Sequence, residues 1–326
     1  MSDTLTLAGG GKLPMVGLGT WKIDTAILPD LIVAAVAAGY RHFDCACDYG
    51  NEKEVGAGIR QAIDQGLCRR EDLWITSKLW NTYHRPEHIR AAAERSLKDL
   101  QLDYFDLYHI HFPIALEFVP FEKRYPPEWF FDPDAAEPKM HPIAVSQAET
   151  WGALQALKTA GMARHLGVCN FNVALIREIT AATSQRPDVL QVELHPYLSQ
   201  ERLLRFCKQA GIAVTAYSPL GAPSYVPLGM AAEDEDLLAE QTIRTIAEAH
   251  GKSPGQISLR WNVQRGAAVI PKTSRVERLA ENIALFDFEL SESEMTSIGQ
   301  LNRDRRFNDP AQFGEAAFNT FFPIYD

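Results

Sequence analysis

The chain has 326 residues, of which 46% are hydrophobic and 23% charged, as is typical of a globular protein with one large domain or two smaller ones. Its formal net charge of −10 argues against nucleic acid as a main partner, because phosphate binding requires a basic surface. No apolar run approaches the ~18 residues that a membrane-spanning helix requires, so no membrane partner is expected.

The cysteines and the first residues predict where the protein resides. The five cysteines follow no regular spacing, and an odd number without a framework indicates reduced thiols. The initial segment MSDTLTLAGGGKLP has no basic region followed by an apolar run, so no signal peptide is expected. We therefore expect a cytoplasmic protein.

Strand-like and helix-like segments alternate along the chain after an initial hairpin, which is predicted over Thr4–Leu7 and Lys12–Val16. Eight strands are predicted at Met15–Gly19, Arg41–Ala46, Leu73–Leu79, Tyr104–His111, Arg164–Cys169, Val189–Leu194, Ala213–Ser218 and Ala267–Thr273. Helices are predicted at Pro29–Ala38, Glu52–Gln65, Pro86–Leu100, Ser146–Ala160, Val173–Thr183, Glu201–Ala210, Gln241–Ala249, Pro254–Gln264, Val276–Leu285 and Glu292–Leu301.

Eight strand-then-helix units without a clear linker favour an α/β fold, a single (β/α)8 TIM barrel that spans residues 1–326. The alternative is an open, doubly wound sheet of similar composition. Three segments exceed the repeating pattern: a long loop at His111–Gln147, a loop at Leu220–Asp236 and a tail at Leu301–Asp326. The first loop is rich in aromatic residues, so we expect it to pack, with the tail, over the barrel mouth.

Polar residues gather at the predicted strand ends, where barrel enzymes place their catalytic groups. Asp44, Lys78 and His111 end successive strands, and Tyr49 lies in the loop after Asp44. Alternation along the strand turns Asp44 into the barrel and Cys45 outward, so Lys78 can pair with the buried carboxylate. A nearby lysine lowers the pKa of a tyrosine, which predicts Tyr49 as a general acid. A structural ion pair is the alternative for Asp44 and Lys78.

Two other chemistries compete for these residues. His109, His111, Glu193 and His195 could hold a metal in a hydrolase, although side chains two apart on any strand share a face. That interpretation leaves Lys78 and Tyr49 unexplained, so no metal is expected. A redox pair of Cys45 and Cys47 is disfavoured, because the spacing is CxC and buried unpaired cysteine is common.

A basic cluster follows the last predicted strand. No GxGxxG fingerprint follows a strand, so a Rossmann site is unsupported. Instead, the segment IPKTSRVER brings a lysine, two hydroxyls and two arginines to the start of a helix. Such a cluster is typical of a phosphate site, which barrels often build after strands seven and eight.

Several ordered motifs resemble the aldo-keto reductase family over almost the whole chain: GYRHFDCACDYGNE, SKLW, HIHFP, GVCNF, QVELHPY, AYSPLG and IPKTSRVERLAEN. The resemblance implies NAD(P)H-dependent reduction of a carbonyl group, with Tyr49 as general acid. It implies that Lys78 and Asp44 tune Tyr49 and that His111 orients the substrate oxygen.

The resemblance also implies a cofactor across the barrel mouth, NADPH by preference and NADH as a possibility. It assigns to this site Thr20, Trp21, Asp44, Cys169, Asn170, Gln191, Tyr217, Ser218, Leu220, Lys272, Thr273, Ser274, Arg275, Arg278, Glu281 and Asn282. Cys169 stands where the family usually has serine, and a thiol is a weak hydrogen-bonding group.

Within the family, the phrases SKLWNTYHRP, HIHFPIALEFVPFEKRYPPEW and RFNDP resemble xylose (aldose) reductases, which implies an open-chain aldose as the small-molecule substrate. The substrate contacts implied are Trp21, Asp48, Trp80, His111, Phe112, Phe307 and Asn308. A sugar-phosphate reductase, a metal-dependent hydrolase and a nicotinamide-binding barrel with little turnover are the alternatives. The protein is expected as a monomer or a homodimer.

Overall fold

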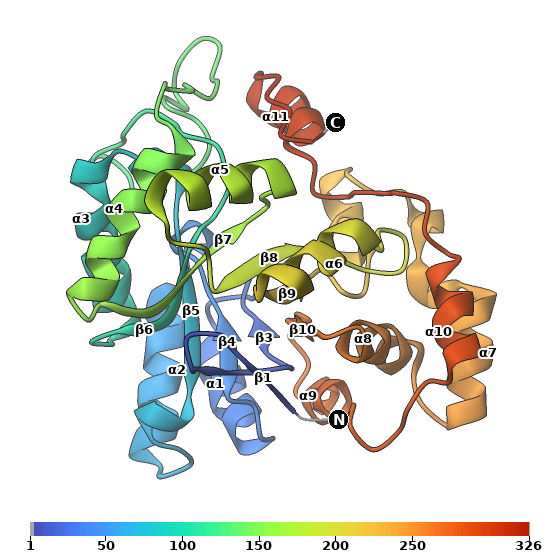
Figure 1. Ribbon diagram of the computed structural model, residues 1–326. Helices are drawn as coiled ribbons and strands as arrows, with labels where there is room; N and C mark the ends of the chain where they lie inside the picture. Colours follow the sequence, from blue (N-terminus) through green and yellow to red (C-terminus); the bar gives the residue numbers. More distant parts are fainter. Residues whose placement is uncertain (1–2, 326) are drawn as a thin grey trace.

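Eight parallel strands form one sheet in chain order in the computed structural model, which describes residues 3–325 (Figure 1). Residues 1, 2 and 326, which the predicted barrel and tail include, lie outside the described residues. The strands are β3 (Leu18–Gly19), β4 (His42–Asp44), β5 (Trp74–Leu79), β6 (Phe105–Ile110), β7 (Ala163–Cys169), β8 (Val189–Glu193), β9 (Ala213–Tyr217) and β10 (Ala267–Val269). All eight strands were predicted, and several of them are shorter in the structure than their predicted ranges.

Backbone hydrogen bonds close this sheet into a barrel. Val16, directly before β3, pairs in parallel with Val269 in β10. The N–H of Gly17 donates to the Val269 carbonyl at 2.8 Å, and the N–H of Val269 donates to the Met15 carbonyl at 2.8 Å. The first and last strands are therefore bonded to each other, which confirms the (β/α)8 barrel and excludes the open sheet.

Helices surround the strands, as Figure 1 shows. They are α1 (Leu28–Ala37), α2 (Glu52–Asp64), α3 (Pro86–Leu100), α4 (Gln147–Thr159), α5 (Val173–Thr183), α6 (Glu201–Ala210), α7 (Gln241–His250), α8 (Pro254–Gln264), α9 (Glu277–Ile283), α10 (Glu292–Gly299) and α11 (Pro310–Phe318). The first ten confirm the prediction. Within residues 3–325, none of the helices combines the length and apolar content needed to cross a membrane.

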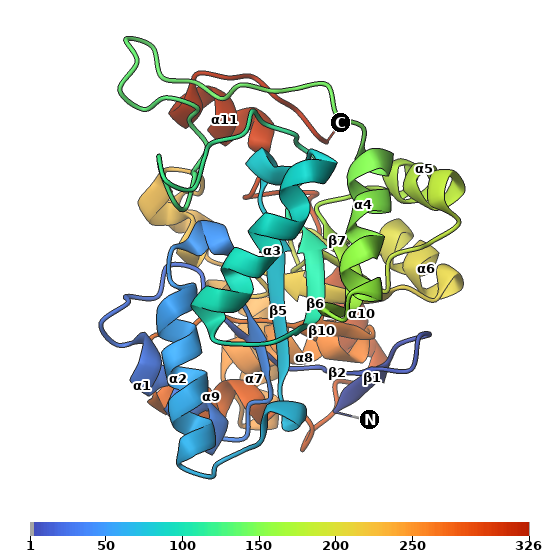
Figure 2. The same cartoon turned by 90° about the vertical axis from the view of Figure 1, so that its left-hand side faces the viewer.

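Helix α11 in the tail was not predicted. The sequence marks only its beginning: the Asp309 carboxylate caps the helix by accepting the Ala311 N–H at 3.0 Å, and Pro310 occupies the first turn. Figure 2 shows α11 beside the loop after β6, at the end of the barrel opposite the antiparallel hairpin of β1 (Thr4–Thr6) and β2 (Lys12–Pro14). The rings of Trp129 and Phe318 stack there at 5.6 Å, so the loop and the tail cover the mouth together, as predicted.

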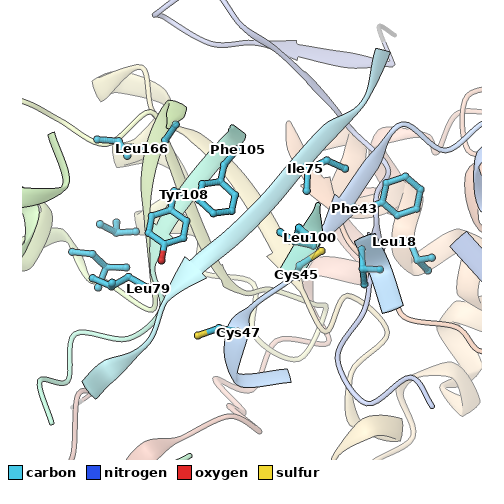
Figure 3. Close-up of a cluster of buried hydrophobic side chains, with 14 of the residues drawn as sticks. Leu18, Phe43, Cys45, Cys47, Ile75, Leu79, Leu100, Phe105, Tyr108 and Leu166 are labelled. Atoms are coloured by element: carbon cyan, nitrogen blue, oxygen red, sulfur yellow. The ribbon is translucent and has the colours of Figure 1, made fainter. Parts of the chain in front are cut away.

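Alternation along β4 separates two environments. Phe43 and Cys45 belong to the buried apolar cluster between strands and helices, together with Ile75, Leu100 and Cys47 (Figure 3). Burial raises the pKa of the thiols of Cys45 and Cys47 well above the ordinary value. Both cysteines are therefore protonated packing residues. Asp44, in contrast, faces the interior of the barrel.

Gly167 in β7 gives a test of how tightly the interior is filled. A Cβ atom there would contact the His109 ring and lie 2.5 Å from the Val189 carbonyl oxygen. Overpacking of this kind costs about 1–3 kcal/mol, so Gly167→Ala is expected to lower the melting temperature. Gly152→Ala is the matched control, because Gly152 is exposed on α4 and its Cβ would meet only Thr183 Cγ2 at 3.8 Å. That change should be neutral or stabilising; a similar loss in both variants would contradict the crowding.

Candidate active site

Lys78 is the centre of a buried polar chain. Strand β5 carries it into the barrel, where its side chain is fully buried. Its ammonium Nζ donates to Asp44 Oδ1 at 2.5 Å, to the Cys45 carbonyl at 2.8 Å and to the Tyr49 hydroxyl at 3.1 Å. Three acceptors match the three N–H groups of an ammonium ion, so the buried charge is fully satisfied.

Asp44 anchors this chain from across the barrel. Its second oxygen, Oδ2, accepts a hydrogen bond from Gln191 Nε2 at 2.6 Å. Strands β4 and β8 stand on opposite sides of the eight-strand sheet, so this bond crosses the interior. The predicted inward direction of Asp44 and its pairing with Lys78 are therefore present.

A tight turn brings Tyr49 to the lysine. The 3-10 turn Cys47–Tyr49 ends at Gly50, which adopts a left-handed conformation with φ 69° that favours glycine. The phenol then lies with its ring centroid 5.8 Å from that of His111, at an angle of 76°. Tyr49 and His111 thus face one another at the mouth, from the loop after β4 and the end of β6.

The predicted direction of the Tyr49 pKa is wrong. Burial raises the pKa of Tyr49 above its ordinary value and outweighs the lowering by Lys78. For Lys78 itself, burial lowers the pKa, but attraction to Asp44 and then Tyr49 outweighs it, so the pKa is raised. At neutral pH the pair is therefore a phenol beside an ammonium, which is a proton donor next to a charge that stabilises its conjugate base.

His111 is a neutral imidazole. Burial, and then the charge of Lys78, hold the pKa of His111 well below its ordinary range. Its ring stacks on Phe112 at 5.0 Å and meets the Trp80 ring edge-on at 5.2 Å. Its carbonyl accepts Asn170 Nδ2 at 2.9 Å, which fixes the backbone. A neutral imidazole held in this way can donate one N–H to an oxygen between it and Tyr49.

A cavity of about 810 Å³ opens over these groups at the carboxyl ends of the strands. Of the predicted site residues, the lining includes Trp21, Asp44, Asp48, Tyr49, His111, Phe112, Asn170, Gln191, Tyr217, Ser218, Leu220, Lys272, Thr273, Ser274, Arg275, Arg278 and Asn308. Seven others do not line it: Thr20, Lys78, Trp80, Cys169, Glu281, Asn282 and Phe307.

Two of these seven lie one layer behind the wall that they were expected to form. Trp80 is fully buried, and its ring packs edge-on against Trp129 at 4.8 Å. Phe307 is also buried and stacks under Tyr225 at 5.7 Å. Trp129 and Tyr225 line the cavity instead, and neither was predicted as a site residue.

Helix α11 supplies further lining that was missed, with Gln312, Phe313, Ala316, Ala317 and Phe318. The available signal was the aromatic content of the tail after the RFNDP phrase. That signal does not give the direction of a side chain, because the helix was not predicted.

Lys272, Arg275 and Arg278 form a cluster of cations on the same cavity wall. All three are exposed, and none pairs with a carboxylate within residues 3–325. The hydroxyl of Thr273 lies among them and accepts the Arg275 N–H at 3.1 Å. In a chain of net charge −10, three cations without partners fit a phosphate-bearing ligand.

The residues of the alternative metal site have other partners. The Glu193 carboxylate accepts His195 Nε2, the Phe307 N–H and the Asn308 N–H, each at 2.8 Å. His109 is fully buried inside the barrel, against Gly167. Among the described residues, no group of three His, Cys, Asp or Glu side chains is arranged to hold a metal ion.

A protein-family model described as "Aldo/keto reductase family" matches residues 15–303. The chain belongs to the aldo/keto reductase family. This membership confirms the resemblance seen in the motifs and makes the protein an oxidoreductase. The metal-dependent hydrolase is excluded by this finding.

Curated relatives in this family cover nearly the whole chain. The NAD(P)H-dependent D-xylose reductase of Scheffersomyces stipitis is 47% identical over 310 residues, which are 94% of this chain and 96% of that protein. The NADPH-dependent aldose reductase of Saccharomyces cerevisiae is 45% identical over 327 residues, 98% of this chain and 100% of that protein. A solved Bombyx mori aldo-keto reductase in complex with NADP has a TM-score of 0.83 at 35% identity and covers 96% and 97% of the two chains.

Proposed function

We propose that this protein reduces the aldehyde group of an open-chain aldose such as xylose to an alcohol, with NADPH preferred and NADH also accepted. The observation that carries the proposal is one cavity with three parts. Its lining includes Tyr49 and Asp44, which Lys78 joins from behind the wall, the unpaired cations around Lys272, and the polar pair Asp48 and Asn308 between aromatic walls. The names of the curated relatives support the same reaction.

Most of the proposed cofactor site follows the cavity lining; Thr20, Glu281 and Asn282 are proposed from the family resemblance and lie outside that lining. Lys272, Thr273, Ser274, Arg275 and Arg278 would hold the 2′-phosphate end, with Glu281 and Asn282 near the adenine. Asn170 and Gln191 would hold the carboxamide, and Tyr217 would lie against the nicotinamide, with Thr20, Trp21, Ser218 and Leu220 along the way. Cys169 is buried and does not line the cavity. The side-chain amides of Asn170 and Gln191 would therefore hold the nicotinamide carboxamide without the serine hydroxyl that the family usually has at position 169. When bound, NAD(P)H supplies the hydride for the carbonyl carbon.

In the proposed mechanism, Tyr49 donates its phenolic proton to the carbonyl oxygen. Lys78, at 3.1 Å, stabilises the phenolate that remains, and Asp44 keeps Lys78 charged. The neutral imidazole of His111 donates an N–H to the same oxygen and orients it. All four groups belong to strand ends or adjacent turns, so the barrel holds them without substrate.

Asp48 and Asn308 are the proposed contacts to sugar hydroxyls. They line the cavity from the turn before Tyr49 and from the tail before α11. The sugar-phosphate alternative is weaker. Apart from the Lys272 cluster, the described lining has one cation, Lys22, and its ammonium donates to the Ser224 carbonyl at 3.0 Å.

The ionisation of Asp48 gives a test of the substrate class. Burial and then repulsion from Glu128 raise the pKa of Asp48 to about 7. The ionised carboxylate, which can accept hydrogen bonds from two hydroxyl groups, therefore forms as the pH rises through this value. We expect kcat/KM for xylose, divided by kcat/KM for butanal, to rise over that range, because the division cancels effects common to both substrates.

Asp48→Asn is the matched variant, and its xylose-to-butanal ratio should be low and independent of pH. These rates would be measured with NADPH and NADH, beside phosphorylated aldoses and aromatic aldehydes. A preference for phosphorylated aldoses, or equal use of butanal and xylose at every pH, would contradict the aldose proposal. Cofactor binding without turnover of any compound would favour the binding-barrel alternative.

We also propose a cytoplasmic location and a monomeric or homodimeric state. The first is supported by five cysteines that are all free and buried, with no disulfide among the described residues. Size-exclusion chromatography with light scattering distinguishes the two oligomeric states.

A further inference from the structure

Tyr325 joins the tail to the end of β7, a contact to which neither the motifs nor the mechanism gives a role. Helix α11 ends at Asn319, which adopts a left-handed conformation with φ 47° and reverses the chain. The Thr320 N–H then donates back to the Gly314 carbonyl at 2.9 Å, and the Thr320 hydroxyl accepts the Met140 N–H at 3.0 Å. The turn therefore directs the following segment back over the barrel mouth (Figure 2).

Two contacts fix the Tyr325 side chain at the end of this segment. Its hydroxyl donates to Asn170 Oδ1 at 3.2 Å, and the guanidinium carbon of Arg306 lies 3.6 Å from the centroid of its ring. Burial raises the pKa of Tyr325 above its ordinary value, so the hydroxyl keeps its proton as a donor. Because Arg306 belongs to the stretch of the tail that carries Asn308, Tyr325 lies between that stretch and β7.

The amide of Asn170 has a defined orientation. Its Oδ1 also accepts the Tyr217 hydroxyl at 2.7 Å, so two donors occupy the two lone pairs of this oxygen. Its Nδ2 donates one N–H to the His111 carbonyl at 2.9 Å, and the reversed amide would place two acceptor oxygens against each other. The amide nitrogen has a second N–H, and Asn170 lines the cavity, so this N–H is the group that it can offer to a ligand.

We infer that Tyr325 is a positioning residue that holds the Asn170 amide with an N–H available to the carboxamide oxygen of a bound nicotinamide. This role rests on the proposed function, in which Asn170 holds the carboxamide. Through Tyr325, the tail that forms part of the substrate wall also stabilises a contact to the cofactor. Since Tyr325 acts at the nicotinamide end, its effect should not depend on the 2′-phosphate.

The test uses Tyr325→Phe, which keeps the ring beside Arg306 and removes the hydroxyl. The loss of one hydrogen bond between neutral groups predicts that the Kd for NADPH and the Kd for NADH both rise about three- to tenfold, by the same factor. The Kd for adenosine 2′,5′-bisphosphate, which lacks the nicotinamide, should not change. Fluorescence titration of the ligand-free protein measures each of these values.

Tyr197→Phe is the matched control. The guanidinium carbon of Arg303, another arginine of the tail, lies 3.6 Å from the centroid of the Tyr197 ring, but the Tyr197 hydroxyl donates to Glu240. This variant should therefore keep the wild-type Kd for each ligand. A fall in cofactor affinity that is shared by both variants would show a general loosening of the tail and overturn the role of Tyr325.

A double-mutant cycle with Asn170→Gly separates positioning from a direct effect of Tyr325. Glycine is chosen because Asn170 has a left-handed conformation with φ 63°. If Tyr325 acts through Asn170, the double variant binds NADPH no more weakly than Asn170→Gly alone. Independent losses in the cycle, a loss for NADPH without NADH, or an equal loss for adenosine 2′,5′-bisphosphate would overturn the inference. Wild-type protein that binds NADPH but reduces no aldose would overturn the proposed function instead, because these Kd values do not depend on turnover.

Discussion

Tyr49→Phe is expected to lower kcat for aldehyde reduction by about 10³-fold, within the range that a positioned general acid contributes. The phenol is the group in the buried chain that both opens on the cavity and carries a transferable proton. Phenylalanine keeps the ring beside His111 and Lys78 but offers no proton to the carbonyl oxygen. Stopped-flow reduction of xylose and butanal, with single-turnover rates, measures the chemical step directly.

The control for this loss is Tyr108→Phe. Tyr108 is fully buried in β6 and stacks on Phe105 at 4.6 Å on the helix-facing side of the sheet (Figure 3). It should retain wild-type turnover, and both variants should bind NADPH as the wild type does. Turnover by Tyr49→Phe within a few-fold of the control would assign the proton to another group.

The pH dependence follows from the same geometry. Burial raises the pKa of Tyr49, so the phenol stays protonated through neutral pH and the proton donor is not lost there. His111 is already neutral, because burial holds its pKa well below the ordinary range. Burial raises the pKa of two carboxyls, Asp48 and Glu52, to about 7, and of these two Asp48 lines the cavity. A titration of the reaction near pH 7 that is lost in Asp48→Asn would therefore be assigned to Asp48.

The catalytic geometry was largely predictable, because two simple rules fix it. Parallel strands of a barrel bring their carboxyl ends to one face, and side chains alternate along each strand. Those rules place Asp44, Lys78 and His111 together without any knowledge of loops. The contact from Gln191 to Asp44 across the barrel follows from the same alternation on β8, but it requires the closed sheet to be known.

The direction of the Tyr49 pKa could not be predicted in the same way. The sequence shows a lysine that lowers the pKa, but the opposing effect of burial depends on the whole wall around the phenol. The outer substrate wall was also missed for a physical reason. Trp129, Tyr225 and Phe313 come from loops and a short helix, whose packing follows no periodic pattern, so their neighbours Trp80 and Phe307 were named in their place.

Arg278→Ala is expected to weaken NADPH binding about 10- to 100-fold, the effect of losing one hydrogen bond to a charged group. NADH has no 2′-phosphate, so its Kd should change little. Lys272, Arg275 and Arg278 have no carboxylate partner within residues 3–325, so removing one cation leaves no buried charge behind. The melting temperature of Arg278→Ala should therefore equal that of the wild type, so the increase in the Kd for NADPH reports the loss of a cofactor contact.

Ionic strength gives this prediction a second measurement. The cations are exposed, and the Debye length shortens from about 30 Å at ~0.01 M salt to about 8 Å at ~0.15 M. The preference of the wild type for NADPH should therefore fall as salt rises, and the slope should be shallower in Arg278→Ala. Arg60→Ala is the matched control, since Arg60 is exposed on α2 outside the cavity. Equal losses for NADPH and NADH in Arg278→Ala would show that the cluster does not bind the 2′-phosphate.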